Sequence, residues 1–120
     1  MLKEIDLNQF TGSEHWYKHL LSGFSFTDGI LYLAKEGGAF WLIDKILISM
    51  RHNKIFKKVE YQEFTVWTLT INRPANEAIL TAEDGNKHQI YKEKIEYTDF
   101  PLDKISLWFE NGVLILPSEH

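Results

Sequence analysis

Two histidines near the N-terminus have the spacing of a helical metal site. His15 and His19 stand four positions apart in the stretch TGSEHWYKHLL. If this stretch is helical, both imidazoles lie on one face, as they do in helical zinc sites. Glu14 precedes the first histidine, so the pattern is EHxxxH, whereas metalloproteases carry HExxH with the glutamate between the histidines. No third ligand is evident, and the other three histidines are remote in sequence.

Carboxylates lie near apolar residues at two places in the chain. Glu96, Asp99 and Asp103 form the densest acidic cluster, and paired carboxylates can act as acid and base when burial separates their pKa values. They stand on a predicted connection between strands, where Thr98 and Asp99 are residue types that set turns by bonding to the backbone. We favour this structural role. Asp44 interrupts an apolar helix and needs a partner if it is buried, which leaves a functional and a structural role open.

A short basic run follows the apolar helix. Residues 51–58, RHNKIFKK, contain four basic residues and no acidic one, in a chain of net charge −4. A local basic site on an acidic body suits one directed contact with a nucleic acid or an acidic protein, although short charged runs are usually solvated loops. The negative net charge speaks against generic binding to phosphate backbones. The predicted partner-binding residues are Arg51, Lys54, Phe56, Lys57, Lys58 and Tyr61.

Composition and missing motifs exclude several classes of protein. The absence of cysteine rules out disulfides, thiolate metal clusters and a cysteine nucleophile. The chain contains none of the GxxxxGK[ST], GxGxxG and GxSxG patterns, so neither a phosphate-binding loop nor a serine-hydrolase elbow is predicted. No apolar run resembles a signal peptide or a membrane span, and we expect a cytoplasmic protein without a cofactor.

The first half of the chain is expected to be helical. Thr11 or Ser13 is the expected cap of a first helix whose buried face would include Trp16 and Leu20. A second helix is predicted to start after Thr27 and to end at Gly37-Gly38. Its buried stripe would be Ile30, Leu31, Leu33 and Ala34. The third stretch, AFWLIDKILISM, is apolar almost all round, which is typical of a central helix covered on both sides.

The second half changes to an alternating pattern. FTVWTLTIN places Trp67, Leu69 and Ile71 on one face of a strand and polar or smaller residues on the other. Hairpin turns are predicted around Asp84-Gly85 and Asn111-Gly112, because these residue pairs suit the positive φ angles of tight turns. The expected fold is α+β, with about three N-terminal helices packed on a C-terminal antiparallel sheet of about four to five strands. We expect one domain over residues 1–120, helical from about 11 to 50 and sheet from about 63 to 117.

Several short motifs resemble those of a known family. NQFTG, TDGILYLA, GGAFWLIDKI, VWTL, YTDFPL and GVLILPSE follow one another over nearly the whole chain. In this respect the sequence resembles an uncharacterised bacterial family, found in part on mobile elements and catalogued as a domain of unknown function. The resemblance implies no catalytic residues.

The resemblance does imply a context. A small acidic protein without cysteine from such a family is similar to the inhibitors that phages use against host immunity, including anti-CRISPR proteins. We therefore expect a non-enzymatic binding protein, an inhibitor of a host immune nucleoprotein that contacts the CRISPR effector or its guide RNA through residues 51–58. The alternatives are a small metal-dependent enzyme using His15, His19 and a carboxylate such as Asp99, and a protein that associates with itself through an exposed sheet edge.

Overall fold

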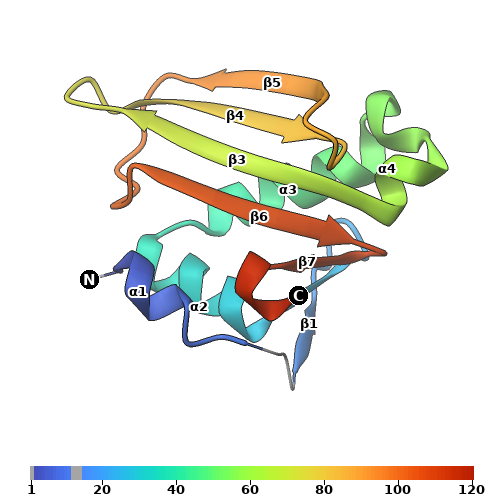
Figure 1. Cartoon of the computed structure of the whole chain (residues 1–120), viewed down its shortest axis with the longest axis horizontal. Helices are drawn as coiled ribbons and strands as arrows, with labels where there is room; N and C mark the ends of the chain where they lie inside the picture. The colour runs from blue at the N-terminus through green and yellow to red at the C-terminus, as the bar shows by residue number, and fades with distance from the viewer. Residues whose placement is uncertain (1, 12–14) are drawn as a thin grey trace.

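The computed structural model describes residues 2–11 and 15–120, with the backbone alone at residues 4 and 5. Helices gather on one side of a single sheet (Figure 1). None of the helices in this described part is long and apolar enough to cross a membrane. The elements, with η marking 3₁₀ turns, are α1 (Glu4–Leu7), β1 (Trp16–Lys18), β2 (Ser25–Thr27), α2 (Asp28–Gly37), α3 (Phe40–His52), η1 (Lys54–Lys57), α4 (Val59–Glu63), β3 (Phe64–Asn72), β4 (Glu77–Glu83), β5 (Gln89–Ile95), β6 (Lys104–Glu110), β7 (Val113–Ile115) and η2 (Pro117–Glu119).

The strands of the described residues form one sheet in the order β1-β2-β7-β6-β3-β4-β5. All neighbours pair antiparallel except β2 and β7, which run parallel. The α+β class is therefore confirmed. The predicted number of four to five strands is wrong, because the sheet has seven in the part of the chain that the structure describes.

The two additional strands replace the predicted first helix. β1 and β2 occupy part of the segment that was expected to be helical, and the proposed cap Ser13 lies outside the described residues. Leu20 is 87% exposed and Trp16 is 59% exposed, so the apolar residues that suggested a buried helical face are not buried. Three residues are too few to show an alternating pattern. β2 is held by β7, a partner from the other end of the sequence.

The second and third helices are confirmed. α2 begins after Thr27 and ends at Gly38, whose φ of 60° is the left-handed conformation that glycine adopts cheaply. Its buried residues include Ile30, Leu33 and Ala34, whereas Leu31 is only partly buried. α3 carries five buried apolar residues, which are Leu42, Ile43, Ile46, Leu47 and Met50.

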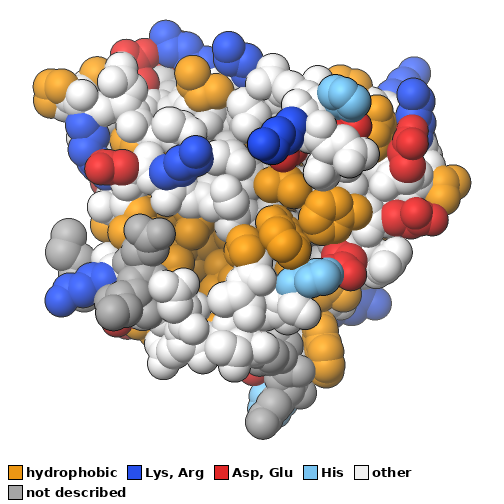
Figure 2. All heavy atoms as spheres, viewed as in Figure 1, with side chains coloured by type: hydrophobic (Ala, Val, Ile, Leu, Met, Phe, Trp, Pro, Cys, Tyr) orange, Lys and Arg blue, Asp and Glu red, His pale blue; other side chains and the backbone are white. Residues whose placement is uncertain are grey.

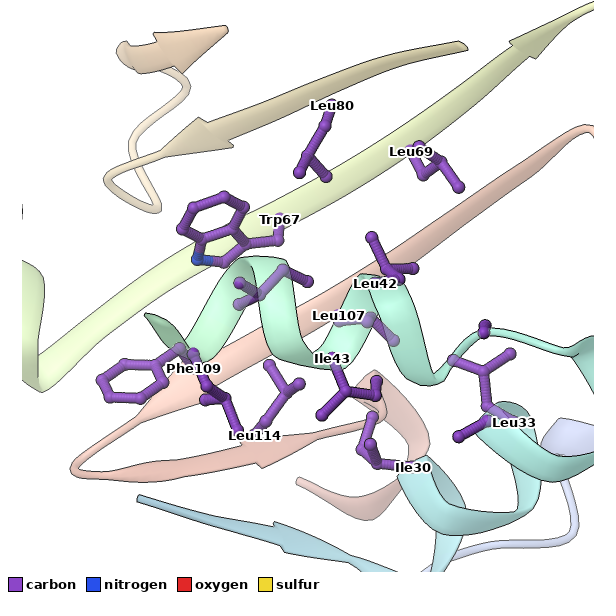
Figure 3. Packing of buried hydrophobic residues seen from close by; sticks show 14 of the residues in the cluster. Ile30, Leu33, Leu42, Ile43, Trp67, Leu69, Leu80, Leu107, Phe109 and Leu114 are labelled. Atoms are coloured by element: carbon purple, nitrogen blue, oxygen red, sulfur yellow. The ribbon is translucent and has the colours of Figure 1, made fainter. Parts of the chain in front are cut away.

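The core lies between these helices and the inner face of the sheet. Trp67 and Leu69 of β3 point toward α3, together with Leu80 of β4 and Leu107 of β6 (Figure 3). Trp67 is fully buried, and its indole N–H donates to Thr65 Oγ1 at 3.1 Å, so no polar atom of the ring is left without a partner. The predicted inward face of β3 is confirmed.

Both predicted hairpin turns are present. Asn111 and Gly112, between β6 and β7, have φ angles of 48° and 86°. Positive φ at both central residues is what a two-residue type I′ turn requires. Gly85 in the β4–β5 turn also has a positive φ, of 88°. The C-terminal strands thus follow from local turn chemistry.

A charged network ties α3 to the edge strand β5. Lys45 Nζ donates to Glu93 Oε2 at 2.7 Å, and the hydroxyl of Tyr91 donates to the same carboxylate. The bond from Lys45, followed by that from Tyr91, lowers the pKa of Glu93 below its usual value. Burial, followed by the bond to Glu93, raises the pKa of Tyr91 to about 12. Glu93 is therefore bound as a carboxylate between an ammonium group and a phenol.

This network predicts a pH dependence of stability. The lowered pKa of Glu93 stabilises the fold above its usual value of 4.5, and this contribution is lost as the pH falls through the lower pKa of the folded state. We expect Glu93→Gln to be less stable than wild type near neutral pH, with a smaller loss of stability on acidification. Urea unfolding at several pH values measures both effects. Glu96→Gln, at an exposed site, is the control; an equal pH dependence in wild type and Glu93→Gln would contradict the prediction.

Candidate functional site

The two histidines of the predicted metal pair do not share a helix face. His15 precedes β1 and His19 follows it. His15 is exposed, with Nδ1 3.5 Å from Asp28 Oδ2. His19 is only 7% exposed, and both its ring nitrogens already have partners. Among the described residues, no group of three or more histidine, aspartate or glutamate side chains is placed to hold a metal ion.

His19 lies between a serine and an aspartate. Its Nδ1 is 2.7 Å from Ser22 Oγ, and its Nε2 is 2.7 Å from Asp44 Oδ1. These are the residue types of a hydrolase triad, but Ser22 is 5% exposed and its Oγ also accepts a hydrogen bond from Phe24 N–H at 3.2 Å. A nucleophile must be open to its substrate. The arrangement instead fastens the β1–β2 turn to α3, which assigns a structural role to Asp44.

The first basic residue of the 51–58 run belongs to the same turn. Arg51 Nε donates to the carbonyl oxygen of Ser22 at 2.7 Å, and its guanidinium lies 4.2 Å from the ring centroid of Phe24. A charged donor on a backbone carbonyl and a cation over an aromatic face are both stabilising contacts. Arg51 therefore holds the turn in place, in addition to its predicted part in partner binding.

The predicted contact residue Phe56 is fully buried. Its ring packs against Trp67 and Tyr91, with centroid distances of 5.2 and 5.7 Å. In this conformation its side chain has no surface for a partner. Sequence reasoning grouped it with the lysines around it because a four-residue 3₁₀ segment has no periodicity that separates inside from outside. Phe56 is the anchor of the segment.

Polar contacts hold the backbone around this anchor. Asn53 Oδ1 accepts from Ile55 N–H at 3.0 Å and caps η1. The side-chain amide of Gln62 donates to Met50 O at 2.9 Å and to Phe56 O at 2.7 Å. Side-chain bonds to backbone carbonyls of this kind fix loops that lack regular structure. The segment from α3 to α4 is thus held at both ends.

The segment from η1 to α4 projects at one end of the sheet (Figure 1), and its exposed side chains include basic and apolar ones. Ile55 is 46% exposed and Val59 is 73% exposed. The half-buried Tyr61 lies beside them, with the Lys58 ammonium 5.7 Å from its ring centroid. We call the exposed set the lysine corner; it consists of Lys54, Ile55, Lys57, Lys58 and Val59. The two aliphatic members were missed from sequence, although both stand beside lysines in the predicted run.

In the segment of the acidic cluster near residue 100, the residue seen to bond to the backbone is Thr98. Thr98 Oγ1 accepts from Phe100 N–H at 3.2 Å, as predicted for a turn residue. Asp103 is paired with Arg73, whose Nε donates to Oδ1 at 2.6 Å, and Asp99 and Glu96 are exposed. All three carboxylates are exposed, so the described residues do not place them in the enclosed site that paired acid and base catalysis would need.

A buried carboxylate that sequence reasoning missed lies at the other end of the chain. Glu119 is 9% exposed and accepts hydrogen bonds from Thr27 Oγ1 at 2.6 Å, Leu116 N–H at 2.9 Å and Gly29 N–H at 3.2 Å. It therefore places a negative charge at the N-terminus of α2, where the helix dipole favours one. A Cβ on Gly29 would lie 2.6 Å from Glu119 Oε1, which explains the glycine.

These observations define the class of protein: a two-layer α+β domain with a basic and apolar projection, and with buried polar groups that hold segments together. The chain belongs to the Family of unknown function (DUF6876), whose model matches residues 1–120. No curated protein and no solved structure matches it.

The histidines predict a contrast in stability. His19→Ala removes a buried group with two partners and should lower the free energy of unfolding by about 2 to 4 kcal/mol. His15→Ala should change it by less than about 0.5 kcal/mol, because exposed ion pairs contribute little. Urea unfolding of the two variants measures the difference. Equal effects would contradict the structural role assigned to His19.

Glu119 predicts a second contrast. Glu119→Ala leaves the donors of Thr27, Gly29 and Leu116 without their acceptor, and we expect a loss of about 2 to 3 kcal/mol. Glu110→Ala, which removes a partly exposed glutamate near the same terminus, is the control and should cost less than about 1 kcal/mol. Thermal unfolding of both variants makes the comparison. A control as unstable as Glu119→Ala would show that the buried carboxylate has no special role.

Proposed function

We propose that this protein is a non-enzymatic binding protein that docks through the lysine corner on an acidic surface of a partner protein. The observation that carries the proposal is the exposure of Ile55 and Val59 among three lysines, on a segment fixed by the buried ring of Phe56. An ordinary solvated loop has no need of apolar side chains at its tip or of a buried aromatic anchor beneath them.

Rigidity supports this role. A surface segment that is ordered before binding loses less conformational entropy when the complex forms. In the lysine corner the backbone is fixed by Asn53 and Gln62, and the side chains that point outward are free to contact a partner. Apolar side chains ringed by charge are typical of interface centres, where the apolar part supplies affinity and the charge selects the partner.

Charge favours an acidic protein over a nucleic acid. Lys54, Lys57 and Lys58 give the corner a positive potential, and Glu60 follows directly. Three lysines beside an acid, on a chain of net charge −4, are few for a site whose affinity comes from displacing counterions from phosphates. They suffice to steer an acidic patch of a partner toward Ile55 and Val59.

The narrower form of the proposal is that the partner is a host immune ribonucleoprotein, such as a CRISPR effector, which the protein inhibits by occupying it. What supports this narrower form is the sequence resemblance described above together with the absence of a catalytic motif in the sequence. Inhibition by occupation needs a docking surface and no reaction.

Reversing the charge of the corner tests the proposal. The variant Lys54→Glu, Lys57→Glu, Lys58→Glu should lose at least about tenfold in affinity for any protein that tagged wild type recovers from its native host, since several charge pairs become repulsive. Arg51 is left unchanged because it holds the β1–β2 turn. Pull-down followed by calorimetry with the purified partner gives the affinities.

The matched control reverses three exposed lysines elsewhere, Lys18→Glu, Lys35→Glu and Lys92→Glu, with the same change in net charge. It should bind within about threefold of wild type. An equal loss of affinity in both variants would show that the effect comes from net charge, and it would overturn the assignment of the binding site to the lysine corner. Recovery that disappears after nuclease treatment would replace the acidic protein by a nucleic acid.

A further inference from the structure

β6, a strand in the middle of the sheet, is paired along only about half of the edge that faces β7. β7 pairs with Trp108, Phe109 and Glu110 of β6 and then ends. The register continues to place Leu116 opposite Leu107 and Pro117 opposite Ser106. Proline has no N–H to donate, and the chain turns away there into η2. Among the described residues, no strand therefore lies beside the first half of β6 on this edge.

The direction of the free backbone groups follows from the register. Glu110 and Val113 flank a two-residue turn, so they form a hydrogen-bonded pair. Hydrogen-bonded and non-hydrogen-bonded pairs alternate along an antiparallel ladder, so Trp108 also exchanges hydrogen bonds with β7. Lys104 and Ser106 are an even number of residues from Trp108, so their backbone N–H and C=O groups also point to the β7 side. Asp103 is the residue before Lys104, so its carbonyl should point to the opposite side. In agreement, this carbonyl accepts from Ile71 N–H on the β3 side at 2.8 Å. Within the described residues, nothing pairs with the N–H and C=O groups of Lys104 and Ser106 on the β7 side.

A groove lies along this free edge. It has a volume of about 690 Å³ and is lined by β6, the segment 101–103 that precedes β6, the end of α1, Leu116 and η2. Leu7, Ile105 and Leu116 supply apolar walls, and Ser118 Oγ donates to Leu7 O at 3.4 Å, which joins η2 to the end of α1. Figure 2 shows a hollow with hydrophobic side chains on the face where Figure 1 places the first half of β6 above α1. Backbone partners and apolar walls thus lie together.

We propose that this groove binds an extended segment of a partner polypeptide, which adds to the sheet as a strand beside Lys104–Ser106. Strand addition to an open sheet edge is a general mode of peptide recognition, in which main-chain hydrogen bonds give affinity and pockets for alternate side chains give specificity. The site is separate from the lysine corner, which lies at the other end of β3, and it goes beyond the function proposed above.

The walls define the chemistry of the segment. A residue opposite Ile105 points inward and meets Leu7 and Leu116, so it should be apolar. A residue opposite Lys104 points outward beside the exposed ammonium group, so an acidic side chain should be preferred. A residue opposite Ser106 points outward beside a hydroxyl and should be polar. The expected motif is an acidic, an apolar and a polar residue in succession, read along the strand from Lys104 to Ser106.

A second copy of this chain is a poorer occupant. The part of β6 that lines the groove is Lys104–Ser106, so the free edge offers main-chain partners to an extended chain of only three or four residues, about 10 to 13 Å. The long edge strand of the molecule, β5, is bonded to β4 along its other side, and its central Glu93 is tied to Lys45. β5 could enter the groove only together with β4, to which it is hydrogen-bonded, and two paired strands are wider than the single extended chain that the groove would take.

Selection from a displayed library of random peptides against the full chain tests the proposal. We expect peptides with the motif, and their binding should shift the amide NMR signals of Lys104 and Ser106. Ser106→Pro removes the groove-facing N–H and leaves the β3 ladder intact, and should weaken binding at least about tenfold. Ser106→Ala is the matched control, because both variants lose the contact between Ser106 Oγ and Thr68 Oγ1 but only the proline lacks the N–H.

A measurement on unmodified protein guards against a fold defect in Ser106→Pro. For a segment that runs antiparallel to β6, N-methylation of a selected peptide at the positions opposite Lys104 and Ser106 should weaken binding at least about tenfold, while methylation at the position between them should not. For a parallel segment the two effects are exchanged. No selected peptide, equal binding by the proline and alanine variants in folded form, or methylation effects without alternation would each overturn the proposal. So would a concentration-dependent dimer that Ser106→Pro abolishes, since a second copy would then occupy the edge.

Discussion

The burial of α3 against the inner face of the sheet is the constraint on which the other features of this structure depend. Its apolar residues meet Trp67 and Leu69, and the described helices gather on this side of the sheet. Burial of apolar surface is the main favourable term in folding, so the position of α3 fixes which side of every strand is inside. Because α3 occupies the inner face of the sheet, the segments before and after it must be attached at the periphery of this core.

Attachment is achieved by polar side chains from distant parts of the chain. His19 bonds to Asp44 of α3, Arg51 at the end of the same helix bonds to Ser22, and Glu119 bonds to the start of α2. Each bond has one partner in a segment too short to form an element by itself. Such bonds replace the apolar burial that three-residue strands cannot supply, and they give the buried His19 and Glu119 a structural role.

Both proposed binding surfaces lie where regular structure stops. After α3 the chain forms a 3₁₀ turn, and the inward turn of Phe56 leaves the lysines and two aliphatic side chains outside. After β7, Pro117 ends the ladder and leaves part of β6 without a neighbour. Rigid elements on either side hold these irregular segments in position, which is the usual relation between a scaffold and its functional loops.

Local periodicity and turn chemistry in the sequence determined α2, α3, the faces of β3 and the two hairpins, because these features depend on residues close together in the chain. Tertiary structure alone decided the strands at residues 16–18 and 25–27, the burial of Phe56 within a basic run and the role of Glu119. The strand at 25–27, Phe56 and Glu119 each depend on a partner remote in sequence, such as β7 for β2, and β1 pairs in turn with β2. Pairing over such a distance leaves no repeating pattern in the segment that is paired, because its free energy comes from the assembled fold.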